Sequence, residues 1–567
     1  MQDRKYTVAD SILDTLKAHN VSTIFGYPGG AILPFYDALP FHKDIKHVLV
    51  RNEQGAAFMA QGWARTRKEI GVCCATSGPG ATNLVTGIAD AHLDSIPILC
   101  ITGQVPLQMI GKDMFQEVDM TGVTLNITKH NFLLEDPSKA VYTVSEAIKI
   151  ALSGRPGPVH IDVPKDVMAC EFLGKREIPN LDFSDTDPMD RAYKALPIST
   201  LDTILKVLNE AKAPMLLVGH GVKHSNGEED LKKLVNKLGI PTVTTILAKG
   251  ILHEDDPNYI GMIGMHGFYH SNMATHEADV ILNIGSRFDD RIVGRYDAFG
   301  RNAVVIHVDI DLSELNKVVD TQIPVHSDAK KFIDQLLSHP EIQKLHIEDW
   351  WKQIRKWEKQ KKYEKETNNF SIRSCLFDLQ NIINEDPDKY ILVTDVGQHQ
   401  MWAMLSLSIP HSTSWLTSGG SGTMGFSLPT AIGAAFANPK KTVICVCGDG
   451  GIQMNIQELA LLAEHKLNIK VLVLNNNYLG MVRQWQELFY DDNYSAVKIF
   501  SPDYKKLAHA YQIKGETITN KKDTKEILNK YLKNAEPCVL EFKVEKEDNV
   551  FPMVPGGKTL ADTIINS

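Results

Sequence analysis

Three stretches of the chain alternate short runs of Val, Ile, Leu and Cys with longer amphipathic segments. This alternation limits the fold more than any other feature of the sequence. Examples of the short runs are Gly71-Val-Cys-Cys-Ala-Thr, Val280-Ile-Leu-Asn-Ile-Gly and Thr442-Val-Ile-Cys-Val-Cys. Such continuous apolar runs are typical of parallel strands that helices bury on both faces. The pattern predicts an α/β protein with three doubly wound parallel-sheet domains.

Two polar segments divide the chain. Residues 175–195 are polar and contain proline, as linkers do, and residues 350–366 have the composition of a charged helical spacer. A chain of 567 residues is long enough for three or four domains. We expect an N-terminal domain at 1–180, a central domain at 190–345 and a C-terminal domain at 370–550.

Charge and composition exclude several classes of function. The formal net charge is −9, so a nucleic-acid-binding surface is not expected. No apolar run approaches the ~18 residues that a membrane helix needs. The first residues have no apolar core behind their charges, so we expect no secretory signal there. The eight cysteines form no Cys-x-x-Cys pair, so we expect buried, reduced thiols and a cytoplasmic protein.

The clearest chemical signal is a pair of motifs at two predicted strand ends. Gly448-Asp-Gly450 follows one strand, and Asn475-Asn-Asn477 ends the next. The carboxyl ends of parallel strands share one edge of a sheet, so the oxygens of Asp449 and Asn476 should lie close together. Such oxygens suit Mg²⁺, and the glycines let backbone N–H groups approach a diphosphate. The residues predict a Mg²⁺–diphosphate site, and the two motifs at this spacing resemble the diphosphate signature of thiamine diphosphate enzymes.

A competing motif, Gly420-Ser-Gly-Thr-Met-Gly425, matches the Gly-x-Gly-x-x-Gly fingerprint of dinucleotide sites, with Asp449 24 residues beyond it. The segment before it, Thr413-Ser-Trp-Leu-Thr-Ser, is a poor buried strand, and Pro429 interrupts the start of the next helix. Asp449 is also explained better as a metal ligand. We therefore interpret the glycines as allowing the backbone to approach thiamine.

Further motifs occur along nearly the whole chain. They include Gly26-Tyr-Pro-Gly-Gly, Arg51-Asn-Glu-Gln-Gly, Ser286-Arg-Phe-Asp-Asp-Arg291, Gly397-Gln-His-Gln-Met-Trp402 and Gly480-Met-Val-Arg-Gln-Trp485. With these motifs the chain resembles the large, catalytic subunits of the acetohydroxyacid (acetolactate) synthase family. The Arg-Phe-Asp-Asp-Arg and Gly-Gln-His-Gln-Met-Trp motifs favour the anabolic, FAD-containing members over the FAD-free catabolic ones.

The resemblance implies an activity, cofactors and partners. Family members decarboxylate pyruvate on thiamine diphosphate and join the hydroxyethyl unit to pyruvate or 2-oxobutyrate. The products are 2-acetolactate and 2-aceto-2-hydroxybutyrate, in valine, leucine and isoleucine biosynthesis. The implied cofactors are thiamine diphosphate, Mg²⁺ and FAD. The implied assembly is a homodimer or larger with shared active sites, together with a small regulatory subunit.

The resemblance also implies roles for individual residues. Glu53 would hydrogen-bond the cofactor pyrimidine, Arg291 would hold the acceptor carboxylate, and Trp485 would contact its alkyl tail. Gln116 and Lys165 would line the substrate channel, with Gly30, Ala31 and Phe115. The implied metal ligands are Asp449, Asn476 and the backbone oxygen of Tyr478. Thiamine diphosphate contacts would come from Glu53, Gly30, Gln398, His399, Gly422, Met424, Gly448 and Gly450. Flavin contacts would come from Arg155, Gly219, Gly221, Gly264, Met265, His266, Gly267, Arg287, Asp309, Ile310 and Asp328.

Two alternatives and three departures accompany this interpretation. A pyruvate oxidase-like enzyme would use the flavin for redox chemistry, and a non-catalytic homologue would only bind cofactor. Intact Glu53, Asp449, Asn476 and Arg291 argue against the second alternative. Asn52 stands where the family usually has His, His220 is in the middle of a usual Gly-Gly-Gly turn, and residues 477–479 differ from the common acidic pattern.

Overall fold

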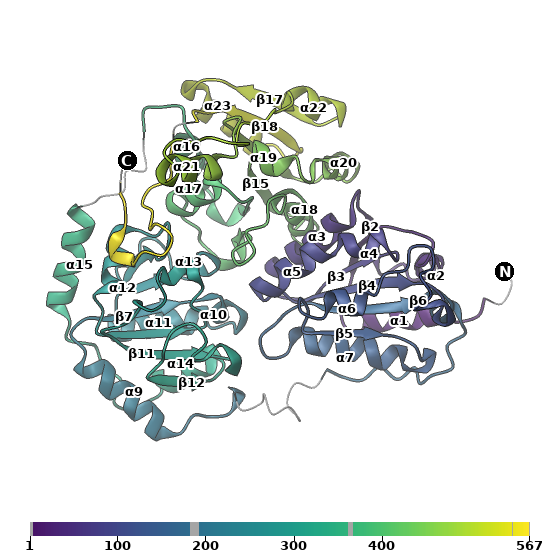
Figure 1. Cartoon of the computed structure of the whole chain (residues 1–567), viewed down its shortest axis with the longest axis horizontal. Coiled ribbons are helices and arrows are strands. Elements are labelled where there is room, and N and C mark those ends of the chain that lie inside the picture. Colours follow the sequence, from purple (N-terminus) through teal and green to yellow (C-terminus); the bar gives the residue numbers. More distant parts are fainter. Residues whose placement is uncertain (1–3, 182–191, 361–366, 547, 566–567) are drawn as a thin grey trace.

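The computed structural model describes residues 4–181, 192–360, 367–546 and 548–565. Its strands form three six-stranded sheets, and every pairing between these strands is parallel. Helices cover both faces of each sheet, so the predicted fold class is confirmed (Figure 1). The predicted linker at 175–195 and the spacer at 350–366 lie partly outside the described residues, at 182–191 and 361–366.

The first sheet has the strand order β2-β1-β3-β4-β6-β5. Its strands are β1 (Thr23–Gly26), β2 (Lys46–Leu49), β3 (Gly71–Ala75), β4 (Ile98–Gln104), β5 (His130–Leu133) and β6 (Val159–Pro164). The helices of this domain are α1 (Val8–Ala18), α2 (Leu33–Ala38), α3 (Glu53–Arg67), α4 (Pro79–Asn83), α5 (Val85–Asp94), α6 (Met120–Thr124), α7 (Ala140–Leu152) and α8 (Lys165–Ala169).

The middle sheet has the order β12-β11-β10-β7-β8-β9. Its strands are β7 (Pro214–Val218), β8 (Thr242–Thr244), β9 (Tyr259–Met262), β10 (Val280–Ile284), β11 (Val304–Asp309) and β12 (Ile323–His326). The helices are α9 (Ile198–Glu210), α10 (His220–His224), α11 (Glu228–Leu238), α12 (Tyr269–His276), α13 (Asp290–Val293), α14 (Ala329–Leu337) and α15 (Glu348–Gln360).

The third sheet has the order β14-β13-β15-β16-β18-β17. Its strands are β13 (Tyr390–Thr394), β14 (Trp415–Leu416), β15 (Thr442–Gly448), β16 (Ile469–Asn475), β17 (Lys514–Ile518) and β18 (Cys538–Lys543). The helices are α16 (Ile372–Ile383), α17 (Gln398–Ser406), α18 (Ser427–Ala437), α19 (Asp449–Ile452), α20 (Leu459–Glu464), α21 (Gly480–Phe489), α22 (Tyr504–Ala510) and α23 (Lys521–Leu532).

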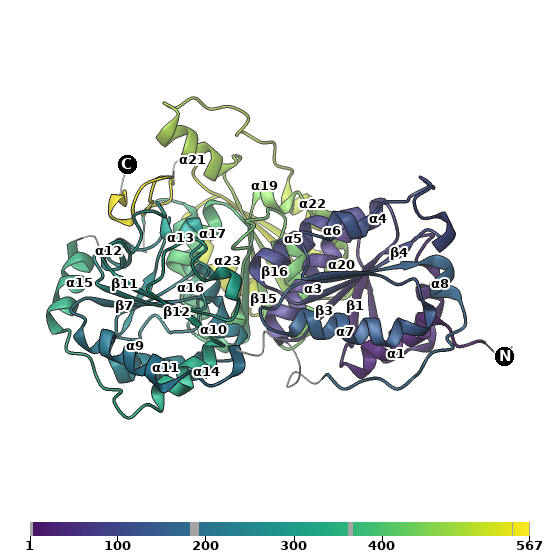
Figure 2. The same cartoon turned by 60° about the horizontal axis from the view of Figure 1, so that its bottom comes forward.

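The first and third domains share one hydrophobic core, because α3 packs along α18 between their two sheets (Figures 1 and 2). A glycine on each helix allows the close approach. A Cβ on Gly62 would lie 2.1 Å from the carbonyl oxygen of Thr430, and one on Gly433 would lie 1.9 Å from that of Met59. This packing fixes α3, and therefore Glu53 at its first turn, against the third domain.

A buried ion pair lies beside this core. Arg65 of α3 donates to Asp94 (2.7 Å), and Asp90 lies 3.6 Å from the same nitrogen; all three side chains are at most 3% exposed. Asp94 in turn accepts hydrogen bonds from the backbone N–H groups of Gly419 and Gly420 in the third domain. The cluster therefore joins two domains through fully desolvated charges.

Arg65→Met should lower the free energy of unfolding by about 3–5 kcal/mol, because it leaves two carboxylates buried without their cation. Denaturant unfolding of the apoprotein measures this effect. Arg67→Met is the matched control on the same helix. Arg67 pairs with Glu69 at the surface, where a pair contributes about 0–1 kcal/mol. Equal losses for the two variants would show that the buried cluster does not stabilise the domain contact.

The C-terminal segment and the cysteines complete the fold. Residues 550–564 return to the middle domain, where the backbone N–H of Val554 donates to Met265 and the carbonyl oxygen of Pro552 contacts His266 (Figure 1). All eight cysteines are free and seven of them are buried, as predicted. Among the described helices, none has the length and apolar composition that crossing a membrane requires.

Candidate active site

One cavity in the third domain contains most of the predicted thiamine diphosphate contacts. Its lining includes Gln398, His399, Met424, Gly448, Asp449, Gly450, Asn476 and Tyr478, but not Gly422. Strands β15 and β16 are neighbours in register, with Gly448 opposite Leu474, so the motifs that follow them meet at one edge of the sheet. Sequence and structure therefore agree on how these two motifs come together.

The predicted metal ligands lie at this edge. Asp449 is buried and accepts a hydrogen bond from the hydroxyl of Ser501 (2.8 Å), while the Asn476 side-chain oxygen accepts one from the backbone N–H of Tyr478 (3.1 Å). Burial raises the pKa of Asp449 to about 6. Within the described residues no group of three or more His, Cys, Asp or Glu side chains is arranged so that it could hold a metal ion. A cation here would need amide, backbone and phosphate oxygens besides Asp449.

The cavity fits a diphosphate. The Nε2 atom of His399 is buried without a hydrogen-bond partner, although His399 lines the cavity. Burial lowers the pKa of His399 to about 4, so the ring is neutral at pH 7 and offers one N–H donor. A Cβ on Gly480 would lie 2.1 Å from the Gln398 side-chain oxygen, so the backbone runs close to the wall. Buried donors and close backbone are what an anionic phosphate group needs.

Asp395 is a residue of this site that sequence reasoning missed. It is buried directly after β13, and its carboxylate accepts hydrogen bonds from the backbone N–H groups of Gly425 (2.9 Å) and Ser427 (3.0 Å). Asp395 thereby fixes the backbone of the residues that directly follow Met424. Asp395 directly follows a predicted strand, as Asp449 does, and this position could have indicated a site residue in the sequence.

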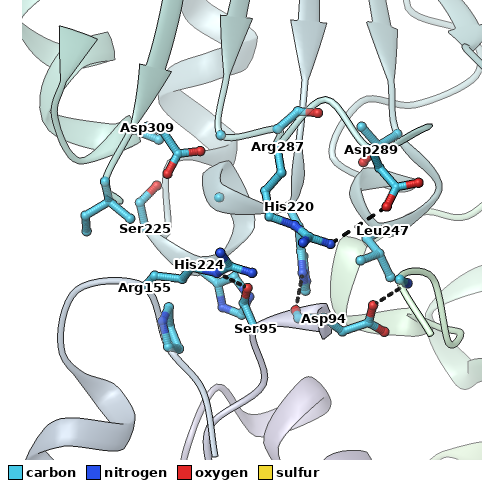
Figure 3. A pocket seen from close by; sticks show the side chains of 18 of the residues that line it. Asp94, Ser95, Arg155, His220, His224, Ser225, Leu247, Arg287, Asp289 and Asp309 are labelled. Carbon is cyan, nitrogen blue, oxygen red and sulfur yellow. Dashed lines mark hydrogen bonds and ion pairs between the residues drawn. The ribbon is translucent and has the colours of Figure 1, made fainter. Parts of the chain in front are cut away.

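A second cavity lies where the three domains meet (Figure 3). Six predicted flavin contacts line it: Arg155, Gly221, Arg287, Asp309, Ile310 and Asp328. Its wall also contains residues that sequence reasoning missed, including Asp94, Ser95, His224, Ser286, Gly419 and Gly420. Gly420 thus faces this cavity and Met424 the other one, so the glycine motif at 420–425 runs between the two.

Two buried polar atoms of the second cavity, His224 Nε2 and Ser286 Oγ, have no hydrogen-bond partner. Gly221 and Gly285 approach so closely that a Cβ on Gly285, whose φ is +68°, would lie 2.7 Å from the Cα of Gly221. Arg155 donates to Ser95 (2.8 Å) and pairs with Glu314 (2.7 Å) at the edge. The residues present fit a long polar ligand such as a flavin dinucleotide.

The remaining predicted flavin contacts lie elsewhere. Gly219 is next to the cavity, packed against Gly285, and does not line it. Residues 264–267 hold the C-terminal segment instead, and the backbone N–H of Met265 donates to the carbonyl oxygen of Arg291 (2.7 Å). Arg291 itself lines the second cavity with its side chain 60% exposed. Flavin contact by Gly219 and 264–267 remains a prediction.

The predicted first-domain residues gather at the carboxyl edge of the first sheet. Glu53 begins α3, where the amide of Asn83 donates to its carboxylate (2.9 Å). Gln116 has a φ of +60°, Phe115 is 88% exposed, and Lys165 begins α8 directly after β6. The described residues that line the third-domain cavity all fall between 372 and 482, so Glu53 of the same chain is not among them.

Trp485 lies on α21, away from both cavity linings. Its ring packs against Phe489 (centroids 5.2 Å apart), and a Cβ on Gly556 of the C-terminal segment would lie 3.7 Å from it. The predicted catalytic residues of one chain are therefore spread over three domains.

Three family models cover the chain in order: the N-terminal TPP binding domain of thiamine pyrophosphate enzymes at 6–123, the central domain at 201–336 and the C-terminal TPP binding domain at 395–542. The acetolactate synthase large subunit of Cyanidium caldarium is 43% identical, over 98% of this chain and 96% of that protein. That of Lactococcus lactis is 44% identical over 96% and 94%, and the isozyme 1 large subunit of Escherichia coli is 40% identical over 98% and 97%.

The chain belongs to the acetolactate synthase large-subunit family.

Membership in this family confirms the resemblance drawn from the motifs and makes the chain a thiamine diphosphate enzyme. The C-terminal TPP binding model spans Asp449 and Asn476, which line the third-domain cavity, and it begins at Asp395. The alignments with acetolactate synthase large subunits cover nearly the full lengths of both proteins and span all three matched domains of this chain.

Proposed function

We propose that this chain is the catalytic subunit of an acetolactate synthase. It would join pyruvate to a second pyruvate or to 2-oxobutyrate in valine, leucine and isoleucine biosynthesis, in the cytoplasm. The observation that carries the proposal is 40–44% identity, over nearly the full length, to proteins named acetolactate synthase large subunit. The cavity at Asp449 and His399 gives that identity a chemical basis.

Asp449, Asn476 and the backbone oxygen of Tyr478 would hold Mg²⁺, which would bind the diphosphate oxygens. Gln398, His399, Gly448 and Gly450 would contact the diphosphate, and Met424 and Gly422 would contact the rings. When bound, thiamine diphosphate supplies an electron sink for decarboxylation of a 2-oxo acid. The carboxylate of Glu53 would hold a proton at the pyrimidine nitrogen, fixing the tautomer of that ring.

Arg291 would bind the carboxylate of the second 2-oxo acid, since a guanidinium holds a carboxylate through two parallel hydrogen bonds. Its side chain is 60% exposed and lies 3.8 Å from the exposed carboxylate of Asp290, so a substrate carboxylate could reach it from solvent. Gln116 and Lys165 would line the channel with Gly30 and Phe115. A Cβ on Gly30 would meet open space, which is consistent with a position beside a substrate path.

FAD would occupy the second cavity, held by Arg155, Gly221, Arg287, Asp309, Ile310 and Asp328. Because Asp94 both lines that cavity and binds the Gly419 and Gly420 amides, flavin would lie against the segment that leads to Met424. This arrangement supports a role for the flavin in holding that segment in place.

Glu53 and the third-domain cavity would come from different chains, which requires at least a homodimer. The proposal is supported by the absence of Glu53 from the described lining of its own chain's cavity. A small regulatory subunit would complete the assembly, since the relatives are named as large subunits.

The products formed from pyruvate test the function. Enzyme supplied with thiamine diphosphate, Mg²⁺ and FAD should form acetolactate without consuming oxygen. Acetate or acetyl phosphate, formed with reduction of the flavin, would instead identify an oxidase and overturn the proposal. No product from pyruvate at full cofactor occupancy would identify a non-catalytic homologue.

Trp485→Leu should lower the preference for 2-oxobutyrate over pyruvate as acceptor by about 10-fold, because a contact with one methylene decides this selection. The ratio of the two products from mixed substrates measures the preference. Phe489→Leu is the control, since Phe489 packs against Trp485 on the same helix and should have a smaller effect. An unchanged product ratio in the Trp485 variant would remove this residue from the acceptor pocket.

A further inference from the structure

A buried carboxylate of the third domain contacts the backbone immediately before Glu53. Glu458 ends the short helix Ile456–Glu458, which follows the Asp449 motif in the sequence, and is 0% exposed. It accepts hydrogen bonds from the backbone N–H of Arg51 (3.0 Å) and from that of Asn52 (2.9 Å). These donors precede the first turn of α3, which Glu53 begins.

Residues of the first domain allow the contact between Glu458 and the start of α3. A Cβ on Gly55 would lie 2.9 Å from the Glu458 carboxylate, so the absence of a side chain there lets the two groups approach. Asn52 caps α3 by accepting from the backbone N–H of Gln54 (2.9 Å), which leaves its own N–H for Glu458. Burial raises the pKa of Glu458 to about 7, and the two N–H donors oppose that rise by stabilising the carboxylate.

The same segment also contacts the thiamine site. Asn455 is buried and donates to the carbonyl oxygen of Gly425 (2.8 Å), next to Met424 in the cavity wall. Residues 455–458 therefore connect the backbone beside Met424 to the backbone beside Glu53 of the same chain. Two hydrogen bonds to consecutive amides fix both the position and the direction of the helix start, and small displacements of a catalytic group have large effects on rate.

We propose that Glu458 is a positioning residue for Glu53: its carboxylate holds the Arg51 and Asn52 amides so that Glu53 projects from α3 at the angle that pyrimidine binding requires. The inference rests on the proposed function, since it needs Glu53 to act on the cofactor. Asn83 holds the Glu53 carboxylate at its far end (2.9 Å), so the side chain is fixed at both ends.

Glu458→Ala should lower kcat by about 10- to 100-fold with little change in the Kd for thiamine diphosphate, because Glu458 does not line the cavity. Exchange of the thiazolium C2 hydrogen of the bound cofactor with deuterium from solvent should slow by a similar factor. A carboxylate that only joins two domains would leave this exchange unchanged at equal cofactor occupancy. Glu458→Gln keeps the size and one acceptor oxygen, so its exchange rate should be intermediate.

Glu464→Ala is the matched control. Glu464 pairs with the guanidinium of Arg51 (2.6 Å) and leaves the backbone amides untouched, so its exchange rate should stay within a factor of about 2 of the wild type. If Glu458→Ala does not fold, the exchange rate measured in Glu458→Gln tests the proposal instead. Wild-type exchange in the folded Glu458 variants would overturn this inference alone, provided that Glu53→Gln is inactive. Wild-type exchange in Glu53→Gln would overturn the proposed function and this inference together.

Discussion

Glu53→Gln should lower the rate of acetolactate formation by about 10²- to 10⁴-fold, the range for loss of a positioned acid–base group. Gln keeps the size of the side chain but neither holds nor releases a proton. The third-domain cavity, which holds the diphosphate contacts, is untouched, so the Kd for thiamine diphosphate should stay close to the wild-type value. Steady-state product formation and calorimetric titration with the cofactor measure the two quantities.

Asn83→Ala is the control for Glu53. It removes the hydrogen bond to the carboxylate without removing the carboxylate, so its effect on rate should be smaller than that of Glu53→Gln. Turnover at the wild-type rate in the Glu53 variant would reject its role in proton transfer. A large loss of cofactor affinity would mean that Glu53 acts mainly in binding.

Asp449→Asn should weaken Mg²⁺-dependent binding of thiamine diphosphate by more than about 100-fold, since it removes the only carboxylate of the proposed ligand set. The substitution keeps the shape of the side chain and removes its charge. Titration with Mg²⁺ at a fixed cofactor concentration measures the loss, and activity should return only at much higher Mg²⁺.

Ser501→Ala removes the hydroxyl that donates to the proposed metal ligand Asp449 and leaves Asp449 itself in place. Ser501 donates to the Asp449 carboxylate at 2.8 Å, and a group in that position affects metal affinity by about 10- to 100-fold. Ser501→Ala should therefore weaken Mg²⁺-dependent cofactor binding less than Asp449→Asn does. Metal-dependent binding that survives Asp449→Asn unchanged would contradict the assignment of this edge of the sheet.

The sequence predicted those features that depend on one sheet and its strand ends. Asp449 and Asn476 are brought together because β15 and β16 are adjacent parallel strands, which short apolar runs already indicated. The three parallel sheets follow from the same pattern. The roles proposed for individual site residues rest on the family resemblance, because a sheet pattern places residues at an edge and does not specify their chemistry.

Contacts between domains were not predictable, since no local pattern encodes them. Glu458 contacts Arg51 across 407 positions of the sequence, and Asp94 binds Gly420 across 326. The second cavity depends on three domains, so no motif marks its wall residues Asp94 and Ser95, and the glycine motif that contains Gly420 did not indicate this cavity. The same cause explains residues 264–267, which contact the C-terminal segment instead of lining that cavity.

Co-assembly of Glu53→Gln and Asp449→Asn chains tests whether Glu53 and the diphosphate site of one centre come from different chains. In a mixed dimer, one site receives both substitutions and the other receives neither. Random pairing of equal amounts of the two inactive chains should therefore restore about one quarter of wild-type acetolactate formation. If both groups instead act within one chain, every site carries one substitution, and the mixture should stay as inactive as either variant alone.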